Sequence, residues 1–406
     1  MQGVRHPHPN ALRTVNTIGA ALRALRLPIA ELKVEPLCRI ASKQTGLSDF
    51  GDPYYREGLQ QVLLSAERDA NLHFWGRFRF HYWLVLQLTN RLLLVETLKR
   101  QPETFQRPLL PPLIIIGLPR TGTTLLHRML ALDPAHRGVA SWEMTRPIPP
   151  QDGSLDRRRQ TAQRGANLQA KLNVNIDHKH YTSPDEPEEC MFMLGLTFVT
   201  VIFWLIAPVF GYMEWFMGQN LFEKKYQDYR RLLQVLQSVH PARRLIMKAP
   251  EHTPAIDVLL EAIPQALVLQ THRNPLAVVP STNSLVYSNQ ISGTNHIDVK
   301  RMAEANLQLL KWDLACNLAA RGKCAGRIYD LQYEQIVNDP VGTMREIYRH
   351  FNLEWPDGFE RCLQAYIEQN PKDKHGSHRY QPEDFGQTAQ EIAQAFRDYN
   401  VEFGYA

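Results

Sequence analysis

Basic residues and hydroxyl groups stand at several points of this chain where a predicted strand ends. The first point follows residues 113–116, four branched aliphatic residues that predict a strand buried on both faces. Gly117, four further residues and Gly122 come next, and apolar residues at helical spacing then begin a helix. The backbone N–H groups of such a turn point outward at the positive end of a helix dipole. The turn therefore predicts a binding site for phosphate.

The side chains of this loop decide which phosphate ligand suits it. A nucleoside-triphosphate-cleaving loop of this spacing carries Lys directly after the second glycine, to reach the outer phosphates. Here Thr123 and Thr124 stand at that point, and Arg120 supplies a cation from inside the loop. The loop can hold a phosphate but lacks the lysine for a triphosphate. An ordinary strand-to-helix turn with incidental glycines is the alternative.

Two more strands predicted in the second half of the chain end in basic residues. Residues 244–248 end in Lys248, and residues 266–273 end in Arg273. Ser281 follows Arg273 by eight residues, about two helical turns, which suits a guanidinium and a hydroxyl that share one phosphate. Consecutive strand–helix units predict a parallel sheet, whose carboxyl edge would bring these groups together. Solvated surface cations are the simpler interpretation.

The loop at residues 119–124, Pro-Arg-Thr-Gly-Thr-Thr, resembles the loop with which sulfotransferases hold 3′-phosphoadenosine 5′-phosphosulfate (PAPS). Arg120 departs from the lysine of cytosolic members and looks more like the membrane-bound and bacterial branches. The spacing from Arg273 to Ser281 matches the 3′-phosphate motif of the same family. Residues 45–52 also look like a segment of one bacterial group, so the resemblance covers nearly the whole chain from residue 45.

The resemblance implies which residues contact the donor nucleotide. The loop residues Arg120, Thr121, Gly122, Thr123 and Thr124 would hold the 5′-phosphate. Lys248 would act in catalysis beside them, and Arg273 with Ser281 would hold the 3′-phosphate.

Two further segments extend the expected nucleotide site. Tyr333 lies in a segment that is close to the nucleotide in the family, although a packed strand aromatic explains it equally well. Lys374 could close the 3′-phosphate site, but the downstream pattern of cytosolic members is missing there. A solvated basic loop is therefore an equal alternative for Lys374.

A sulfuryl transfer also needs a base for the acceptor proton. A predicted strand over residues 139–143 would carry Glu143 to the ligand-binding edge of the sheet, although a surface ion pair with Arg146 explains this position equally well. The resemblance makes Glu143 the preferred candidate, because several branches of the family use a glutamate there. His252 is second. Acids at residues 185–189 are interpreted mainly as helix caps, with Glu186 as a further base candidate.

The fold expected is an α/β, P-loop NTPase-like, three-layer fold with a central parallel sheet flanked by helices. Residues 1–107 would form a helical N-terminal extension that packs on the core. Residues 108–406 would form the sulfotransferase-like domain, with a helical insertion around residues 150–240.

Composition limits the other function classes. The net charge is +5 without a dense basic run, which argues against nucleic acid as a partner. Five scattered cysteines predict a reducing, cytoplasmic location and no zinc site. Residues 191–213 carry no charge, yet glycines, threonines and a proline interrupt them. A membrane span at residues 191–213 would also place the loop at residues 117–124 and the strand ends at Lys248 and Arg273 on opposite sides of the bilayer. We therefore expect no membrane span but a buried helix pair or a lipid-facing lid, the second of which would allow membrane contact.

The predicted activity is transfer of a sulfuryl group from PAPS to a hydroxyl or amine of a small acceptor. The aromatic stretch 191–217 suggests a lipophilic acceptor, but buried packing explains it equally well. No metal is expected, since this group carries less charge than a phosphoryl group. A P-loop kinase or nucleotidase and a non-catalytic, membrane-associated nucleotide binder are the alternatives. The oligomeric state is not readable from the sequence.

Overall fold

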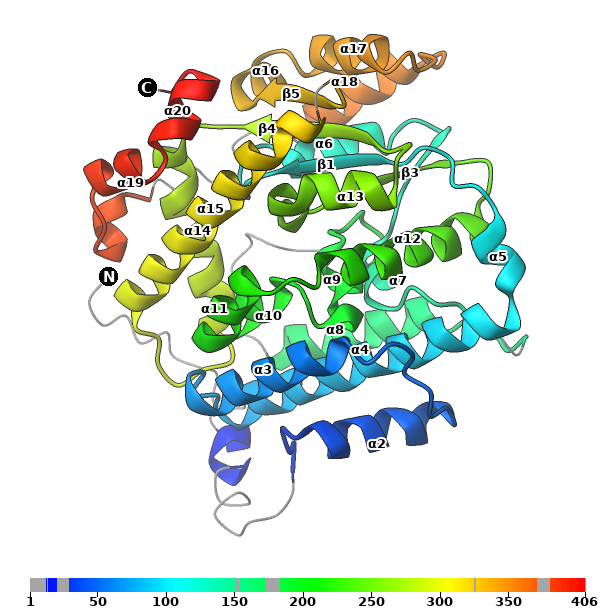
Figure 1. The fold of residues 1–406 in the computed structure, drawn as a ribbon, viewed down its shortest axis with the longest axis vertical. Coiled ribbons are helices and arrows are strands. Elements are labelled where there is room, and N and C mark those ends of the chain that lie inside the picture. The colour runs from blue at the N-terminus through cyan, green and yellow to red at the C-terminus, as the bar shows by residue number, and fades with distance from the viewer. Residues whose placement is uncertain are drawn as a thin grey trace.

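The computed structural model describes residues 12, 14–19, 29–150, 153–172, 183–324, 326–370 and 380–405. Its centre is a sheet of five parallel strands in the order β2-β3-β1-β4-β5 (Figure 1). The strands are β1 (Leu113–Gly117), β2 (His136–Gly138), β3 (Arg244–Lys248), β4 (Leu267–His272) and β5 (Ile328–Gln332). The loop predicted to bind phosphate follows the central strand, with the basic strand ends Lys248 and Arg273 on the two neighbouring strands.

Side chains of the central strands alternate between two apolar layers. Leu113 and Ile115 face a cluster with α6 (Thr123–Leu130), α17 (Pro340–His350) and α18 (Phe359–Gln369). Ile114 and Ile116 face a cluster with α12 (Phe222–Val239) and α13 (Ile256–Ala262). Because both faces are covered, the strands are apolar throughout, and the predicted three-layer α/β fold is confirmed.

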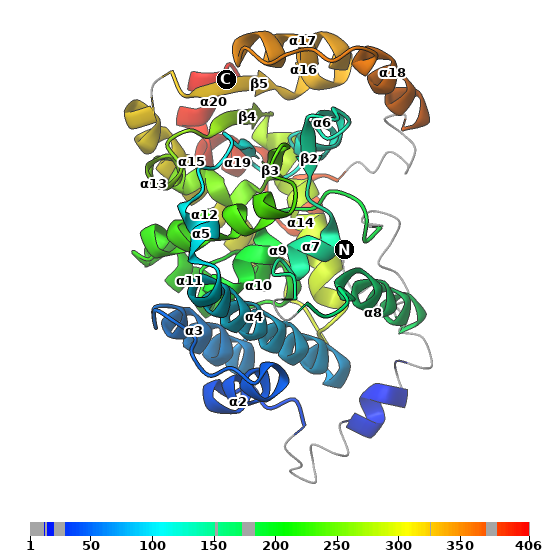
Figure 2. The same ribbon diagram turned by 90° about the vertical axis from the view of Figure 1, so that its right-hand side faces the viewer.

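The N-terminal helices form a layer on the far side of α9–α12 from the sheet (Figures 1 and 2). Beside helical residues 14–19, this layer contains α2 (Val34–Thr45), α3 (Tyr55–Arg68), α4 (Phe74–Arg100) and the short α5 (Pro102–Gln106). One continuous apolar cluster joins α2, α3 and α4 to residues 191–216 and to Val286 and Leu309. The layer therefore shares a core with the rest of the chain.

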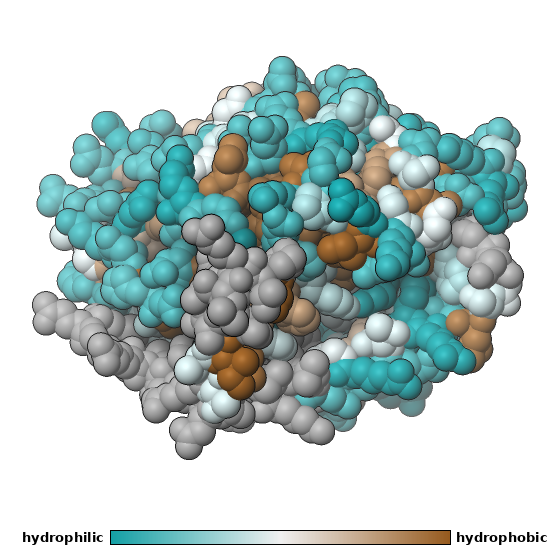
Figure 3. All heavy atoms as spheres, turned by 90° about the horizontal axis from the view of Figure 1, so that it is seen from below, coloured by the Kyte–Doolittle hydropathy of each residue, from teal (hydrophilic) through white to brown (hydrophobic). Residues whose placement is uncertain are grey.

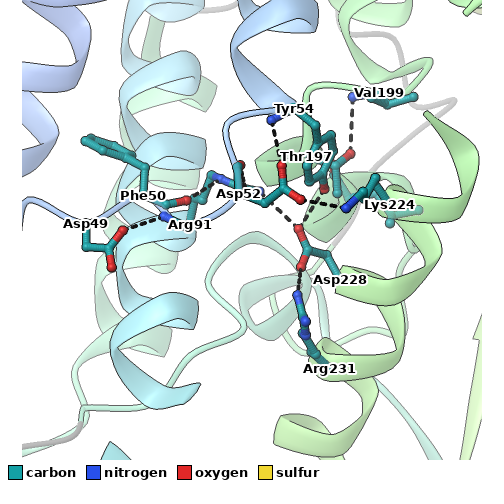
Figure 4. A network of polar contacts seen from close by, with 12 residues as sticks. Asp49, Phe50, Asp52, Tyr54, Arg91, Thr197, Val199, Lys224, Asp228 and Arg231 are labelled. Atoms are coloured by element: carbon teal, nitrogen blue, oxygen red, sulfur yellow. Dashed lines mark hydrogen bonds and ion pairs between the residues drawn. The ribbon is translucent and has the colours of Figure 1, made fainter. Parts of the chain in front are cut away.

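A buried ion pair reinforces this junction (Figure 4). Arg91 of α4 lies 3.0 Å from Asp228 of α12, and both side chains are almost fully buried. The same guanidinium donates to the carbonyls of Phe50 (2.8 Å) and Asp52 (2.7 Å). Tyr54 donates to the Asp228 carboxylate at 2.6 Å. Residues 45–52 thus help to hold the N-terminal layer against α12, through the bonds of Phe50 and Asp52 to Arg91.

The connection from β2 to β3 is helical, as expected for the region around residues 150–240. It contains α7 (Ser141–Thr145), α8 (Arg158–Leu172), α9 (Met191–Leu194), the 3₁₀ turn η2 (Gly195–Thr197), α10 (Ile202–Ile206), α11 (Phe210–Gly218) and α12. The structure corrects one part of this region: Glu143 lies in the helix α7, and the strand before it ends at Gly138.

The apolar stretch 191–213 folds into short helices whose large side chains are mostly buried, Phe203 and Tyr212 completely. It is packed between α3, α4 and α14 and offers no lipid-facing lid, so that alternative was wrong. Among the described residues, no helix combines the length and apolar character that crossing a bilayer requires.

The remaining elements complete the second half of the chain. They are η3 (Pro250–Ala255), α14 (Pro275–Ile291), α15 (Val299–Arg321), η4 (Gly322–Cys324), α16 (Tyr333–Asn338), η5 (Pro382–Phe385), α19 (Ala389–Ala395) and α20 (Arg397–Phe403). The chain's last two helices, α19 and α20, meet at Phe396.

Candidate active site

The loop between β1 and α6 has the strained geometry of a phosphate cradle. Gly117 has φ +122°, and a Cβ there would lie 2.4 Å from the Thr271 carbonyl oxygen, so only glycine fits. Arg120 itself has a positive φ of 68°, which is uncommon for a residue with a side chain. Gly122 caps α6 with φ +88°. These conformations turn the loop around the N-terminus of α6.

The threonines of the loop have different tasks. Thr121 is completely buried, donates to the Leu118 carbonyl at 2.6 Å and lies 2.6 Å from the Thr271 hydroxyl. Its side chain therefore holds the loop together, which leaves only its backbone N–H for a ligand. The Thr123 side chain is also buried, whereas Thr124 is exposed and accepts from Lys248 Nζ at 3.4 Å.

Arg120, Arg273, Ser281 and Tyr333 lie together beside the loop. Arg120 Nε donates to Ser281 Oγ at 3.0 Å, and Arg273 Nη1 donates to the Arg120 carbonyl at 2.8 Å. The Arg273 guanidinium lies 3.9 Å from the centre of the Tyr333 ring. Neither guanidinium has a carboxylate within ion-pair distance in the described part of the chain. Two unneutralised cations beside a hydroxyl suit an anionic ligand.

Lys248 stands on the other side of β1, at the end of β3, and is almost completely buried. Its ammonium group forms an ion pair with Glu189. Glu189 lies in the segment 183–190, which is held along residues 139–142 by backbone hydrogen bonds and joined to β3 by the bond from Cys190 N to the Lys248 carbonyl (2.9 Å). The acidic segment thus crosses the sheet edge next to the start of α6.

Glu188 is the second acid beside Lys248. Its carboxylate accepts from the Glu189 N–H at 2.9 Å. Burial raises the pKa of Glu188 to about 7, although the Lys248 charge acts in the opposite direction. A carboxyl group that titrates near neutral pH has the proton affinity that suits a general base.

The segment 183–190 was interpreted mainly as a source of helix caps, and the structure corrects this. α9 begins after Cys190 without any side-chain cap, and Glu186 forms an ion pair with Arg128 of α6. Glu188 and Glu189 were not singled out from the sequence. Only their position beside the strand end Lys248 separates them from ordinary surface acids.

The two bases expected from the sequence lie elsewhere. Glu143 is buried and forms an ion pair with Arg137. The Nη1 atom of Arg137 also donates a hydrogen bond to the Leu236 carbonyl of α12 at 2.8 Å. Arg137 lies in the edge strand β2 and pairs in register with Leu245, near the start of β3 and three residues before Lys248. Glu143 is therefore not brought to the edge where Lys248 ends.

His252 is completely buried in η3. Its ring packs against Tyr229 (4.9 Å between ring centres), and Nδ1 lies 3.2 Å from the Tyr226 hydroxyl. Burial first and the nearby Lys225 second lower the pKa of His252 well below its usual range. An acceptor could not reach this ring without unpacking α12.

Lys374 lies outside the described residues. Among those described, no group of three or more His, Cys, Asp or Glu side chains is arranged to hold a metal ion.

A central parallel sheet flanked by helices, with a glycine-containing loop between its central strand and the next helix, is the P-loop-like α/β fold. Residues 111–357 match the model of the sulfotransferase family, and this chain belongs to that family.

Solved structures agree with this assignment. The sulfotransferase STF1 from Mycobacterium tuberculosis is 29% identical, with a TM-score of 0.79, and the match covers 90% of this chain and 98% of that one. The sulfotransferase STF9 from Mycobacterium avium is 26% identical, with a TM-score of 0.82, over 91% of this chain and 96% of that one.

Two curated relatives are similar over a shorter region. They are the omega-hydroxy-beta-dihydromenaquinone-9 sulfotransferases Stf3 of Mycobacterium bovis and Mycobacterium tuberculosis. Each is 29% identical over 261 residues, which are 60% of this chain and 63% of the relative.

Proposed function

We propose that this chain transfers a sulfuryl group from PAPS to a hydroxyl group of a lipophilic acceptor. The observation that carries the proposal is the pair of cationic sites on either side of the loop, in a member of the sulfotransferase family. Arg120, Arg273 and Ser281 would hold one phosphate, and Lys248 with Thr124 would face the other. A 3′,5′-bisphosphorylated adenosine presents two such phosphates, and Tyr333, whose ring lies beside the Arg273 guanidinium, would contact the nucleotide.

The chemistry assigned to these residues is an in-line displacement. The acceptor oxygen forms a bond to sulfur while the bond from sulfur to the 5′-phosphate oxygen breaks. Loop N–H groups, Thr124 and Lys248 stabilise the negative charge that develops on the leaving phosphate. Arg273 and Ser281 hold the other end of the nucleotide and so orient the donor.

Glu188 is our candidate for the base that takes the acceptor proton. It lies beside Lys248 and has a pKa of about 7, whereas the carboxylates of Glu143 and Glu186 are occupied by arginines. Glu189 would position the Lys248 ammonium group before the donor binds. This assignment replaces Glu143 as the preferred base.

Calorimetric titration tests the donor class. We expect the desulfonated product, 3′-phosphoadenosine 5′-phosphate (PAP), to bind without a divalent ion, and ATP with Mg²⁺ to bind far more weakly. Arg273→Gln should weaken PAP binding by about tenfold to a hundredfold, because it removes a charge-assisted contact. Binding of ATP with Mg²⁺ as tight as that of PAP would instead favour the kinase alternative.

The acceptor class follows from the relatives, whose name specifies a hydroxylated menaquinone derivative. We infer a lipophilic alcohol for this chain. Transfer of radiolabelled sulfate from PAPS to a panel of hydroxylated isoprenoids, sterols and short-chain alcohols would test this. Turnover of the short, water-soluble alcohols alone would contradict it.

A further inference from the structure

An unusual surface runs along α4 and across α7 to α8. On α4, the Trp75 ring stacks on Phe78 at 5.7 Å, and Tyr82 follows Phe78 by one helical turn. Phe78 is 43% exposed and Tyr82 is 49% exposed. We call this surface the aromatic–arginine face. It consists of Trp75, Phe78, Tyr82 and Trp142 together with Arg79, Arg146 and Arg158.

Hydrogen bonds connect the parts of this face. Arg146 donates to the Tyr82 hydroxyl at 2.5 Å and, through its carbonyl, accepts from Arg158 at 2.8 Å. The Arg158 guanidinium lies 4.9 Å from the centre of the Trp142 ring. In Figure 2, α8 lies next to α4 on this side of the molecule. The face is therefore a joined surface built from three elements.

The charges on this face are mainly positive. Arg146 has no carboxylate partner among the described residues, whereas Arg79 donates to the Ser292 hydroxyl at 3.1 Å and burial lowers the pKa of its guanidinium. The nearby acids are neutralised already, since Asp156 pairs with Arg158 and Asp185 pairs with Arg159. Figure 3 views the molecule from below and shows separate apolar patches among mostly polar side chains.

The face is also connected to the candidate active site. Trp83, the neighbour of Tyr82, meets the Phe192 ring edge-on at 6.0 Å. Phe192 follows Glu189 by three residues. Two buried polar atoms on this route, Trp83 Nε1 and Glu189 Oε2, lack hydrogen-bond partners among the described residues. Buried polar atoms normally have partners, so these two mark a place where a polar ligand group would fit.

We propose that the aromatic–arginine face docks on the surface of an anionic phospholipid bilayer, and that the acceptor passes from the bilayer along Trp83 and Phe192 to the active site. Amphipathic rings prefer the boundary between hydrocarbon and headgroups, and unpaired guanidinium groups bind lipid phosphates. The docking step stands by itself, whereas the delivery step rests on the proposed function.

Vesicle flotation tests the docking step. Full-length protein should float with vesicles of phosphatidylglycerol and phosphatidylcholine in equal parts, and much less with phosphatidylcholine alone. Phe78→Ser should reduce the partition coefficient by about tenfold, because one exposed ring leaves the bilayer. Arg146→Gln should weaken binding to the anionic vesicles only. Val401→Ser, on α20, removes another exposed apolar side chain and should change nothing.

Three results would overturn the proposal. The first is equal partitioning of wild type and Phe78→Ser, and the second is no flotation of the wild type. The third is a wild-type dimer in sedimentation that Phe78→Ser converts into a monomer, which would make the face a contact between copies of this chain.

A second measurement separates delivery from catalysis. Phe78→Ser should slow sulfuryl transfer to an acceptor dissolved in vesicles while PAP affinity and transfer to the same acceptor in detergent stay unchanged. Equal losses in vesicles and in detergent would reject delivery through this face. If the wild type floats but transfers nothing in either medium, the proposed function fails while the docking step survives.

Discussion

The Arg91–Asp228 pair of the N-terminal layer and the Lys248–Glu189 pair at the sheet edge are both largely removed from water, but their polar atoms are satisfied to different degrees. Both oxygens of Asp228 accept hydrogen bonds, from Tyr54, Arg91 and Arg231. Glu189 uses one oxygen for Lys248, while its other oxygen is buried and has no hydrogen-bond partner among the described residues.

This difference separates a structural network from a binding site. Removing one member of a fully satisfied buried pair leaves the other charge unpaired, so the cost falls on stability. A buried polar atom normally has a hydrogen-bond partner, and in our proposal the bound ligand supplies the partner of Glu189. Mutations in the first network should therefore affect folding, and mutations in the second should affect chemistry.

The largest expected effect is that of Glu188→Gln at the sheet edge. If Glu188 is the base, kcat should fall by about 10²–10⁴-fold with PAP affinity nearly unchanged. In the wild type, kcat/KM should rise with pH and level off above about 7, since the deprotonated carboxylate is the active form and burial raises its pKa to about 7. The matched control is Glu186→Gln. The range from pH 6 to 8 extends about 1 pH unit on either side of this pKa. A wild-type rate that stays constant over that range would exclude Glu188 as the base.

Asp228→Asn tests the other side of the comparison. It should lower the free energy of unfolding by about 3–5 kcal/mol, because Arg91 keeps its charge in a buried position. Transfer per folded molecule should stay at the wild-type rate. Urea denaturation and a rate normalised to the concentration of PAP-binding sites would measure both quantities. A loss of rate without a loss of stability would place this network in the active site.

Glu143→Gln sharpens the comparison, because sequence reasoning made Glu143 the base. Its buried pair with Arg137 resembles that of Asp228, so we expect a loss of about 2–4 kcal/mol in stability. The transfer rate should change by less than about threefold, since Glu143 is not beside Lys248. Loss of turnover with unchanged stability would return the role of base to Glu143.

Ser281→Ala should have the smallest effect of the series. It removes one neutral hydroxyl next to Arg120 and should weaken PAP binding by about fivefold to tenfold. Stability should not change measurably, because Ser281 is only half-buried. Thr282→Ala, one residue further on, removes a buried hydroxyl that bonds the Val278 carbonyl, and should leave PAP affinity intact.

Much of the nucleotide end of the site was predictable from local pattern. Strand ends at Lys248 and Arg273 are visible as apolar runs that stop at a basic residue, and parallel strands bring such ends to one edge. Glu143 was placed wrongly because the strand before it ends early and a short helix turns its side chain towards Arg137. Short elements depend on packing more than on their own residues.

The sequence by itself determined the parallel sheet, the phosphate cradle and the cations around it, because each depends on the spacing of a few residues along one segment. Only the tertiary structure decided which acid stands beside Lys248. Glu143, Glu186, Glu188 and Glu189 are chemically alike along the chain. They differ through the partners that folding brings to them, an arginine for the first two and the buried strand end for the last two.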